Sequence, residues 1–340
     1  MNFDYNEEQQ LLADSVRRYL ADKYPFEQRQ KIVRGAGWSA EAWAQFAQMG
    51  LTGLPVSAEH GGFGGGAVDL MGVMEAFGEA LVVEPYLSHV MATRAAERGG
   101  ATEFLSAVID GSMKLAWAHG GKGVTARKDG ARWTLEGEVR GVIGAPVADR
   151  LVVTSGAGEL FLVGKVEAKA HRTMDERLAG DVVLRGAEAQ PLKASVEDLV
   201  DFGTALVCAE AVGVMKFACD TTLEYLKTRK QFGVTIGTFQ ALQHRMVDMF
   251  ISLEQARSMA CLACSRADAG GDRKSISAAK IKIADAARHI SQESVQLHGG
   301  MGMSDELKVS HAFRRLTVLA REFGDADCHL ARFSEISAAS

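Results

Sequence analysis

The sequence of 340 residues lacks the usual signatures of nucleotide-binding enzymes and of membrane proteins. It contains no GxGxxG, GxxxxGKS or GxxxxGKT run, so neither a Rossmann-type NAD site nor a P-loop is supported. No segment approaches the roughly 18 uninterrupted apolar residues that a membrane span needs. The start, MNFDYNEEQQ, has no basic end followed by an apolar stretch. We therefore expect a soluble, cytoplasmic protein without a membrane span.

Cysteine is scarce, and its number is odd. The five cysteines are Cys208, Cys219, Cys261, Cys264 and Cys328. An odd set inside apolar helical patterns predicts reduced thiols rather than a disulfide framework. Cys261 and Cys264 form a CxxC, but no second pair or spaced histidine completes a zinc site. Buried thiols are favoured, and no metal is expected.

An excess of basic charge is absent as well. The formal net charge is −5 at pH 7, and the basic residues are spread along the chain. This distribution offers no electrostatic footprint for a nucleic-acid backbone, so nucleic acid is not an expected partner. Apolar residues make up 47% and charged residues 24%, as in ordinary globular proteins. The length predicts two or three packed units.

The pattern of the chain changes twice. Residues from about 6 to 110 have helical periodicity, with Asn6 as a candidate N-cap. Short β-rich runs follow, at residues 133–135, 151–153, 160–163 and 182–184. Helical periodicity returns after about residue 195. We expect a mostly α-helical protein with a middle β domain, divided as an N-terminal helical domain (1–112), a β domain (113–190) and a C-terminal helical bundle (191–340).

Two long apolar stripes and one nearly all-apolar segment define the expected bundle. The stretch from Ala205 to Cys219 carries only Glu210 and Lys216 as charges, which predicts a buried central helix. One stripe comprises Leu242, Met246, Met249, Leu253, Ala256, Ala260 and Ala263. The other comprises Ile276, Ala279, Ile283, Ala286, Ile290 and Leu297. Core packing is the expected role of the methionines.

The glycine-rich run from Leu54 to Gly66 interrupts the N-terminal helices. So many glycines permit backbone geometry and close approaches that side chains would forbid. The run is either a shaped loop or a flexible one.

Three local sequences resemble the acyl-CoA dehydrogenase family, and together they cover nearly the whole chain. The first is the spacing Gly50-Leu51, Pro55, Glu59, Gly61-Gly62, Gly64, followed by a helix that contains Glu75. The second is Thr228–Gly233, similar to the family's RxxFG loop, with Phe239-Gln240 after it. The third is Gln296–Gly302, similar to the family's QxxGGxG turn. The resemblance implies an N-terminal helical domain, a small β-barrel domain and a C-terminal four-helix bundle.

The resemblance also implies FAD as cofactor. By position, Arg229 inherits the contact to the FAD pyrophosphate that relatives make across a subunit interface, and a guanidinium suits phosphate oxygens. Phe232 would pack beside the adenosine half. Gln231, Gln240 and Gln296 offer amide groups, and Gly299-Gly300 would expose backbone N–H groups to a phosphate. Alternatively, Arg229 pairs with a carboxylate, Phe232 is core, and the glycines end a helix.

The family reaction is α,β-desaturation of an acyl-CoA thioester, in which a carboxylate removes the α-proton. In most relatives this base follows the QxxGGxG turn, and the equivalent residue here is Phe323. Glu322 is adjacent, but a step of one residue turns a helical side chain by about 100°. Asp325 is the candidate base that we prefer.

Other relatives carry the base near the start of the central helix, where this chain has Gly203. Asp201 and Glu210 lie on either side of it. Both are expected to be ordinary charges, unless the local backbone differs from that of relatives.

The segments that clasp the flavin ring in relatives are shortened here. They correspond to Ala116–Gly123 and Arg140–Ala145. His119 would either cover the ring or face solvent.

The missing base and the weak clasps resemble the small subunits of paired bacterial acyl-CoA dehydrogenases, which act on pimeloyl-like or steroid side-chain thioesters. The ending Phe323–Leu330, FGDADCHL, is also similar to theirs. The resemblance implies a subunit of a heteromeric enzyme, in an assembly with a homologous large subunit or in a homo-oligomer, with an electron-transfer flavoprotein as electron acceptor. The alternatives are a self-sufficient dehydrogenase that uses Asp325, and a flavin-free structural or acyl-CoA-binding partner.

Overall fold

The computed structural model describes residues 5–120 and 123–339. The chain forms two compact units whose segments alternate along the sequence. Unit 1 contains residues 1–28, 67–82 and 201–340, and unit 2 contains residues 29–66 and 83–200. The division into 1–112, 113–190 and 191–340 was drawn from changes in the sequence pattern, whereas these two units are defined by compactness. The three-part division therefore stays a prediction.

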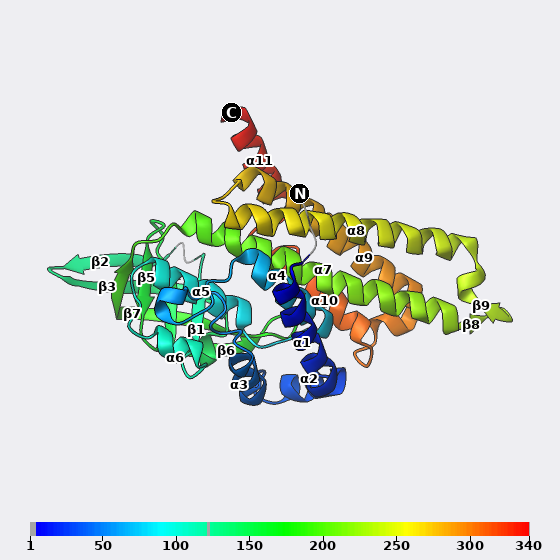
Figure 1. Cartoon of the computed structure of the whole chain (residues 1–340), viewed down its shortest axis with the longest axis horizontal. Coiled ribbons are helices and arrows are strands. Elements are labelled where there is room, and N and C mark those ends of the chain that lie inside the picture. Colours follow the sequence, from blue (N-terminus) through cyan, green and yellow to red (C-terminus); the bar gives the residue numbers. More distant parts are fainter. Residues whose placement is uncertain (1–4, 121–122, 340) are drawn as a thin grey trace. The chain divides into compact units, whose positions relative to one another are not determined.

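Unit 1 is helical, and the expected C-terminal four-helix bundle is formed by α7 to α10 (Figure 1). Its helices are α1 (Glu7–Lys23), α4 (Ala67–Ala80), α7 (Val196–Thr228, which begins in unit 2), α8 (Gln240–Asp268), α9 (Arg273–His298), α10 (Lys308–Leu319) and α11 (Ala326–Ala339). Helix α2 (Phe26–Arg34) continues from unit 1 into unit 2. Asn6 caps α1 as predicted, because its side chain accepts a hydrogen bond from the Gln9 amide at 2.8 Å.

The two apolar stripes lie as predicted on α8 and α9. All six residues of the α9 stripe are buried. On α8 the stripe is buried from Met249 onward, whereas Leu242 and Met246 are only half-buried. The first turns of α8 therefore have fewer neighbours in this chain than the rest of the helix.

The predicted central helix is α7, whose residues from Ala205 to Met215 are all buried. By length and composition α7 is apolar enough to cross a membrane, but 89% of its most apolar window is buried inside the protein. Burial of this extent is typical of the core helix of a bundle.

Helices α4 and α7 touch backbone to backbone at two glycines. A Cβ atom at Gly213 would lie 1.9 Å from the Glu75 carbonyl oxygen, and one at Gly78 would lie 2.1 Å from the Glu210 carbonyl oxygen. Neither position has room for a methyl group.

We expect Gly213→Ala to lower the free energy of unfolding by about 1–3 kcal/mol, because the helices must separate to admit the methyl group. Gly164→Ala is the matched control, because a Cβ at Gly164 meets no atom within 4 Å. Urea denaturation of both variants measures the difference. Equal stability of the two variants would contradict the packing argument.

Unit 2 combines helices with the β-sheet. Its helices are α3 (Ala40–Gln48), α5 (Tyr86–Arg98) and α6 (Leu105–Ile109), with the short turn η1 (Ala58–His60). The glycine run from Leu54 to Gly66 is a shaped loop, because Cβ atoms at Gly62 and Gly65 would lie 2.2 Å and 2.9 Å from backbone oxygens of the same loop.

The described strands β1 to β7 form one mixed sheet. They are β1 (Leu115–Ala118), β2 (Thr125–Asp129), β3 (Arg132–Ile143), β4 (Arg150–Thr154), β5 (Leu160–Val163), β6 (Ala168–Arg172) and β7 (Leu178–Leu192). The hydrogen-bonded order is β1-β4-β5-β7-β3-β2, and β6 pairs with β7. Only the β1–β4 pair is parallel among these described strands. The four predicted β runs all lie within strands β3, β4, β5 and β7.

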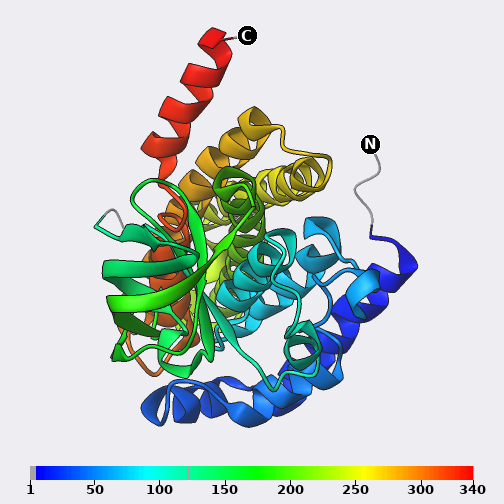
Figure 2. The same ribbon diagram turned by 90° about the vertical axis from the view of Figure 1, so that its left-hand side faces the viewer.

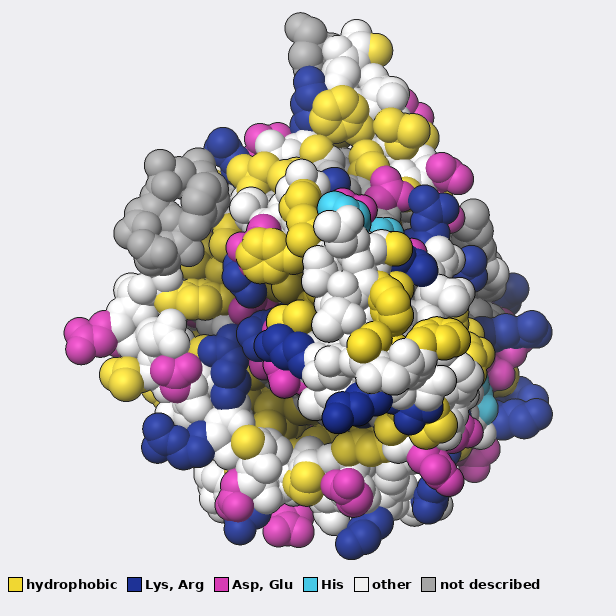
Figure 3. Space-filling view, turned by 90° about the vertical axis from the view of Figure 1, so that its right-hand side faces the viewer, with side chains coloured by type: hydrophobic (Ala, Val, Ile, Leu, Met, Phe, Trp, Pro, Cys, Tyr) yellow, Lys and Arg dark blue, Asp and Glu magenta, His cyan; other side chains and the backbone are white. Residues whose placement is uncertain are grey.

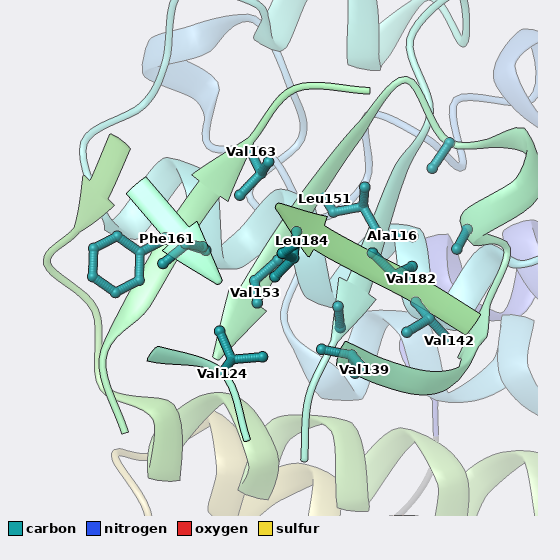
Figure 4. Close-up of a cluster of buried hydrophobic side chains, with 14 residues drawn as sticks. Ala116, Val124, Val139, Val142, Leu151, Val153, Phe161, Val163, Val182 and Leu184 are labelled. Atoms are coloured by element: carbon teal, nitrogen blue, oxygen red, sulfur yellow. The ribbon is translucent and has the colours of Figure 1, made fainter. Parts of the chain in front are cut away.

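Figure 2 shows the strands curling around a common interior, and Figure 4 shows the side chains that fill it. Val139 and Val142 of β3 meet Val153 of β4, Phe161 of β5 and Leu184 of β7 there. Two register shifts between β3 and β7 accompany this curvature, one with its extra residue at Gly186 of β7 and the other after Val139 of β3. The resulting core is all apolar.

Candidate functional site

The second motif, Thr228–Gly233, forms a tight hairpin after α7. Strands β8 (Lys230–Gln231) and β9 (Val234–Thr235) pair across a turn at Phe232 and Gly233. These two residues have φ of +54° and +81°, which is typical of a type I′ turn. A phenylalanine at positive φ is strained by about 1–2 kcal/mol. The strained turn leaves the Phe232 ring 90% exposed, so Phe232 is not a core residue.

Arg229 is exposed at the base of this hairpin, which we call the Arg229 hairpin (residues 229–235). Its backbone N–H donates to the Tyr225 carbonyl at 2.8 Å, and its carbonyl accepts from the Ile236 N–H at 2.9 Å. Within residues 5–120 and 123–339, its guanidinium makes no hydrogen bond or ion pair with the protein. The alternative that a carboxylate of this chain holds Arg229 therefore loses support.

The third motif ends α9 in a bare turn, the glycine turn (residues 299–302). Gly299 has φ +61° and ψ −146°, a conformation that is almost restricted to glycine. Cβ atoms at Gly299 and Gly300 would meet nothing within 4 Å, whereas one at Gly302 would lie 2.5 Å from the Val295 carbonyl oxygen. Gly302 is packed, and Gly299 and Gly300 present exposed backbone that an anion can approach.

Both motifs lie at the same end of the bundle, at the right of Figure 1. The rings of Tyr225 on α7 and His298 on α9 stack there, with centroids 4.4 Å apart. The amide side chains predicted from the motifs, Gln231, Gln240 and Gln296, are exposed, and Gln240 is the first residue of α8. The end of the bundle thus gathers a guanidinium, three amides and the glycine turn.

Exposed apolar side chains lie on the Arg229 hairpin, beside the glycine turn and on the adjoining parts of α7 and α8. We call them the bundle-end patch, and their exposed fractions run from 38% to 90%. Its members are Leu223, Phe232, Val234, Phe239, Val247, Phe250, Ile251, Met301 and Met303. Figure 3 shows hydrophobic patches between Lys and Arg side chains on this side of the molecule. Apolar exposure of this extent is typical of surfaces that meet another molecule.

Buried polar side chains hold the backbone of the loop in which the resemblance places the base. We call it the 320–325 loop. Lys280 on α9 donates from Nζ to the Leu319 carbonyl at the end of α10. His329 on α11 contacts the Phe323 carbonyl through Nε2 at 3.1 Å and the Ser277 hydroxyl through Nδ1 at 3.3 Å. Phe323 and Gly324 adopt φ of +59° and +109° between these anchors.

Asp325 ends this loop as the N-cap of α11. Its Oδ1 accepts a hydrogen bond from the Cys328 N–H at 2.9 Å, and this bond is the main reason why the pKa of Asp325 lies below its usual value. The carboxylate is exposed and borders a cavity of about 450 Å³ between α9, α10 and α11. Capping is thus one established use of Asp325, and its role as a base stays a proposal.

Asp325→Asn separates these two roles. Asparagine keeps a side-chain oxygen that can accept from the Cys328 N–H, so we expect an unchanged melting temperature. If Asp325 is the base of a self-sufficient enzyme, turnover falls by about 10²-fold to 10⁴-fold, because the α-proton has lost its acceptor. Unchanged turnover in a chain that is active alone rules out that role.

The other carboxylates considered as bases are committed to arginines. Glu210 accepts from Arg315 Nη1 at 2.5 Å, and both side chains are buried. Asp201 forms a bidentate pair with Arg332 of α11 and lies 3.5 Å from Arg273 Nε. Both are structural charges, as expected. Glu322 is half-buried on the same side of the loop as Lys280.

His329 gives unit 1 a predictable dependence on pH. Its Nε2 contacts a carbonyl, which only accepts, so Nε2 carries the proton of the neutral ring. Burial is the main cause that lowers the pKa of His329 from 6.5 to about 4. The unfolded chain therefore binds this proton between about pH 4 and 6.5 and the folded chain does not, so stability rises with pH across that window.

We expect wild type to lose about 2 kcal/mol of unfolding free energy through His329 between pH 7 and pH 5, and His329→Gln to lack this part of the loss. Urea denaturation at the two pH values measures the slope. Buried His89 in unit 2, with a pKa lowered to about 3, adds a slope of the same sign and is present in both proteins. Identical slopes would contradict the assignment.

The clasp segments lie in unit 2. His119 follows β1, is exposed, stacks on Trp117 and lies 3.1 Å from the Thr154 hydroxyl through Nδ1. The rest of that segment includes residues 121–122, which lie outside the described residues. In the second segment a Cβ at Gly144 would lie 2.4 Å from Pro85 Cβ, so this position excludes a side chain.

No group of three or more potential metal ligands occurs within the described part of the chain. Cys208, Cys219 and Cys264 are buried, Cys261 is half-buried and Cys328 is exposed. All five are free thiols. The expectation of buried thiols thus holds for Cys264 and only partly for Cys261.

Reasoning from the sequence did not identify Tyr225 and His298 as parts of the bundle end. It also did not identify Lys280 and His329 as anchors of the 320–325 loop. His298 lies inside the third motif and Tyr225 lies one helical turn before Arg229, so proximity along the chain was the available signal. Lys280 offered none, because a lysine on a polar helical face reads as solvated.

Comparisons with known proteins agree with the fold. Residues 6–109 match the family model of the acyl-CoA dehydrogenase N-terminal domain, and residues 194–335 match that of the C-terminal domain. The acyl-CoA dehydrogenase IpdE2 of Mycolicibacterium smegmatis is 30% identical over 315 residues, 91% of this chain and 92% of the relative.

Two solved structures superimpose over nearly the full length. The steroid ACAD Tcur3481-Tcur3483 (G363A variant) is similar with a TM-score of 0.92 and 27% identity, covering 98% of this chain and 99% of the other. The ChsE4-ChsE5 complex from Mycobacterium tuberculosis is similar with a TM-score of 0.92 and 25% identity, covering 100% of both chains.

Proposed function

Because the chain belongs to the acyl-CoA dehydrogenase family, we propose that it is a subunit of a heteromeric FAD-dependent acyl-CoA dehydrogenase whose catalytic base comes from another chain. The observation that carries the proposal is a combination of features in one chain. The chain has a free Arg229 guanidinium and the glycine turn, but it has Phe323 where relatives have their base. The family's chemistry is oxidoreduction, and its cofactor is FAD.

The residues of the bundle end fit the diphosphate of FAD. A guanidinium without a protein partner can bind two phosphate oxygens at once, and open backbone at Gly299 and Gly300 can donate N–H groups. Exposed Phe232 offers an aromatic face to the adenosine half, and Gln231, Gln240 and Gln296 offer amide donors. The chemistry that FAD supplies when bound is acceptance of the substrate's β-hydrogen as a hydride.

The bundle-end patch supports a partner chain at this site. Nine large apolar side chains are exposed on the Arg229 hairpin, beside the glycine turn and on the adjoining parts of α7 and α8. A partner that covers them would exclude water from the diphosphate and strengthen its contacts to Arg229. The two similar structures, a steroid ACAD named as a pair and the ChsE4-ChsE5 complex, favour a homologous chain as that partner.

The similarity to a steroid ACAD supports a steroid acyl-CoA thioester as substrate. An electron-transfer flavoprotein as electron acceptor and a cytoplasmic location complete the proposal, together with a tetramer that contains both kinds of chain. The self-sufficient enzyme with Asp325 as base is the second candidate, because Asp325 borders a cavity and lies two residues after Phe323.

The visible absorption spectrum of the purified chain tests the proposal, with released FAD counted per protomer and acyl-CoA added to saturation. We expect less than one FAD per chain, no bleaching of the flavin band by acyl-CoA, and measurable binding of ADP. One tightly held FAD per chain that acyl-CoA bleaches would show a self-sufficient dehydrogenase. A colourless chain that binds neither FAD nor ADP would show a flavin-free partner.

A further inference from the structure

A stacked aromatic pair joins the two ligand-facing motifs at the end of the bundle. We propose that Tyr225 and His298 act as a positioning pair, which fixes the Arg229 guanidinium relative to the glycine turn so that both reach one diphosphate. The inference rests on the proposed function, because it concerns the same site. It assigns roles to two residues that touch the motifs without belonging to the set that would contact the ligand.

The pair contacts each motif through the backbone. The Tyr225 carbonyl accepts the Arg229 N–H at 2.8 Å, so Arg229 follows Tyr225 by one helical turn. On the other side, His298 directly precedes Gly299, and its carbonyl accepts a bond from the Tyr225 hydroxyl at 3.4 Å. A shift of Tyr225 relative to His298 therefore displaces Arg229 relative to Gly299.

The two rings form a close, nearly parallel stack. The ring centroids lie 4.4 Å apart and the planes are inclined by 27°. His298 Nδ1 lies 2.8 Å from the Ser294 carbonyl, which only accepts, so Nδ1 carries the proton and the ring orientation is fixed along α9. His298 is 4% exposed, and Tyr225 is half-buried. A stacked pair held by a hydrogen bond on each ring allows little relative movement.

The hairpin needs such an anchor because its own side chains are exposed. From Arg229 to Val234 every residue is exposed, and the turn is strained at Phe232. A guanidinium on such a segment binds phosphate well only if its backbone is held in place, since a displacement of about 1 Å can cost about 10²-fold in a positioned contact. The Tyr225–His298 stack provides that restraint at the base of the hairpin.

The test is a double-mutant cycle, with ADP as the probe and isothermal titration of the full chain as the measurement. We expect Tyr225→Leu to weaken ADP binding by about tenfold, and Tyr225→Phe, which keeps the ring, by at most about twofold. In the Arg229→Gln background, Tyr225→Leu should cause no further loss, because the group that it positions is already gone. A role in stability alone would weaken binding equally in both backgrounds.

A control variant separates positioning from general destabilisation. Met249→Ala removes a fully buried side chain of α8 in the same bundle and should lower the melting temperature without changing ADP affinity. An equal effect of Tyr225→Leu with and without Arg229, or no effect at all, overturns the positioning role while the proposed function stands. Failure of wild type to bind either ADP or FAD overturns the proposed function, and this inference with it.

Discussion

Arg315→Met lowers the free energy of unfolding by about 3–5 kcal/mol, the largest effect on stability that we expect from one substitution in unit 1. Arg315 lies on α10, and its guanidinium donates to Glu210 of α7 at 2.5 Å and to the Val82 carbonyl at 2.9 Å. Both charged side chains are at most 5% exposed. Without the arginine, the Glu210 carboxylate would remain buried and would lose the guanidinium that pairs with it.

Urea denaturation near pH 7 measures this loss. Arg288→Met is the matched control, because Arg288 pairs with Asp285 at 3.5 Å and both side chains are more than half exposed. Exposed pairs contribute about 0–1 kcal/mol. The double variant Arg315→Met with Glu210→Leu should recover part of the stability, since the buried carboxylate charge has then been removed as well. A single Arg315→Met variant as stable as the control would contradict the assignment of a buried ion pair.

Arg229→Gln weakens binding of ADP by about 10-fold to 100-fold, because a charge-assisted contact to phosphate is worth about 1.5–3 kcal/mol. Lysine at this position should retain part of the affinity, since it keeps the charge but loses the bidentate geometry. The melting temperature should not change in the absence of ligand. Arg229 is exposed and forms no side-chain contact within the described parts of the chain that could be lost.

Isothermal titration at two salt concentrations measures this effect, and the affinity of wild type should fall more steeply with salt than that of Arg229→Gln. Lys227→Gln is the matched control. Lys227 is an exposed cation two residues away that already pairs with Glu224 at 2.8 Å. If Lys227→Gln and Arg229→Gln lose affinity equally, the contribution is the general charge of the surface and not a contact of Arg229.

Periodicity made the helices and strands predictable because each element buries one face. The α9 stripe is the clearest case, and the four β runs lie inside strands for the same reason. The first two residues of the α8 stripe, Leu242 and Met246, are only half-buried, so the stripe extends beyond the part of α8 that this chain buries. An apolar stripe shows that a face is covered, and it does not say whether the same chain covers it.

The candidate site was predictable where the motif residues are neighbours along the chain. The partners of Asp201 and Glu210 were not, because Arg332 is 131 and Arg315 is 105 residues away in the sequence. No local pattern couples residues at such separations. The capping role of Asp325 could have been predicted, since an aspartate before an apolar helical run is a common signal for a helix N-terminus.

The two side chains that anchor the 320–325 loop, Lys280 and His329, determine which substitutions the loop can accept. Lys280 and His329 form hydrogen bonds with the backbone carbonyl oxygens of Leu319 and Phe323, which are groups that every amino acid carries. At Leu319 and Phe323 the path of the loop thus does not depend on the identity of the side chain. A substitution at position 323 should therefore change the side chain that the loop presents without changing the path of the backbone, which leaves this position open to engineering.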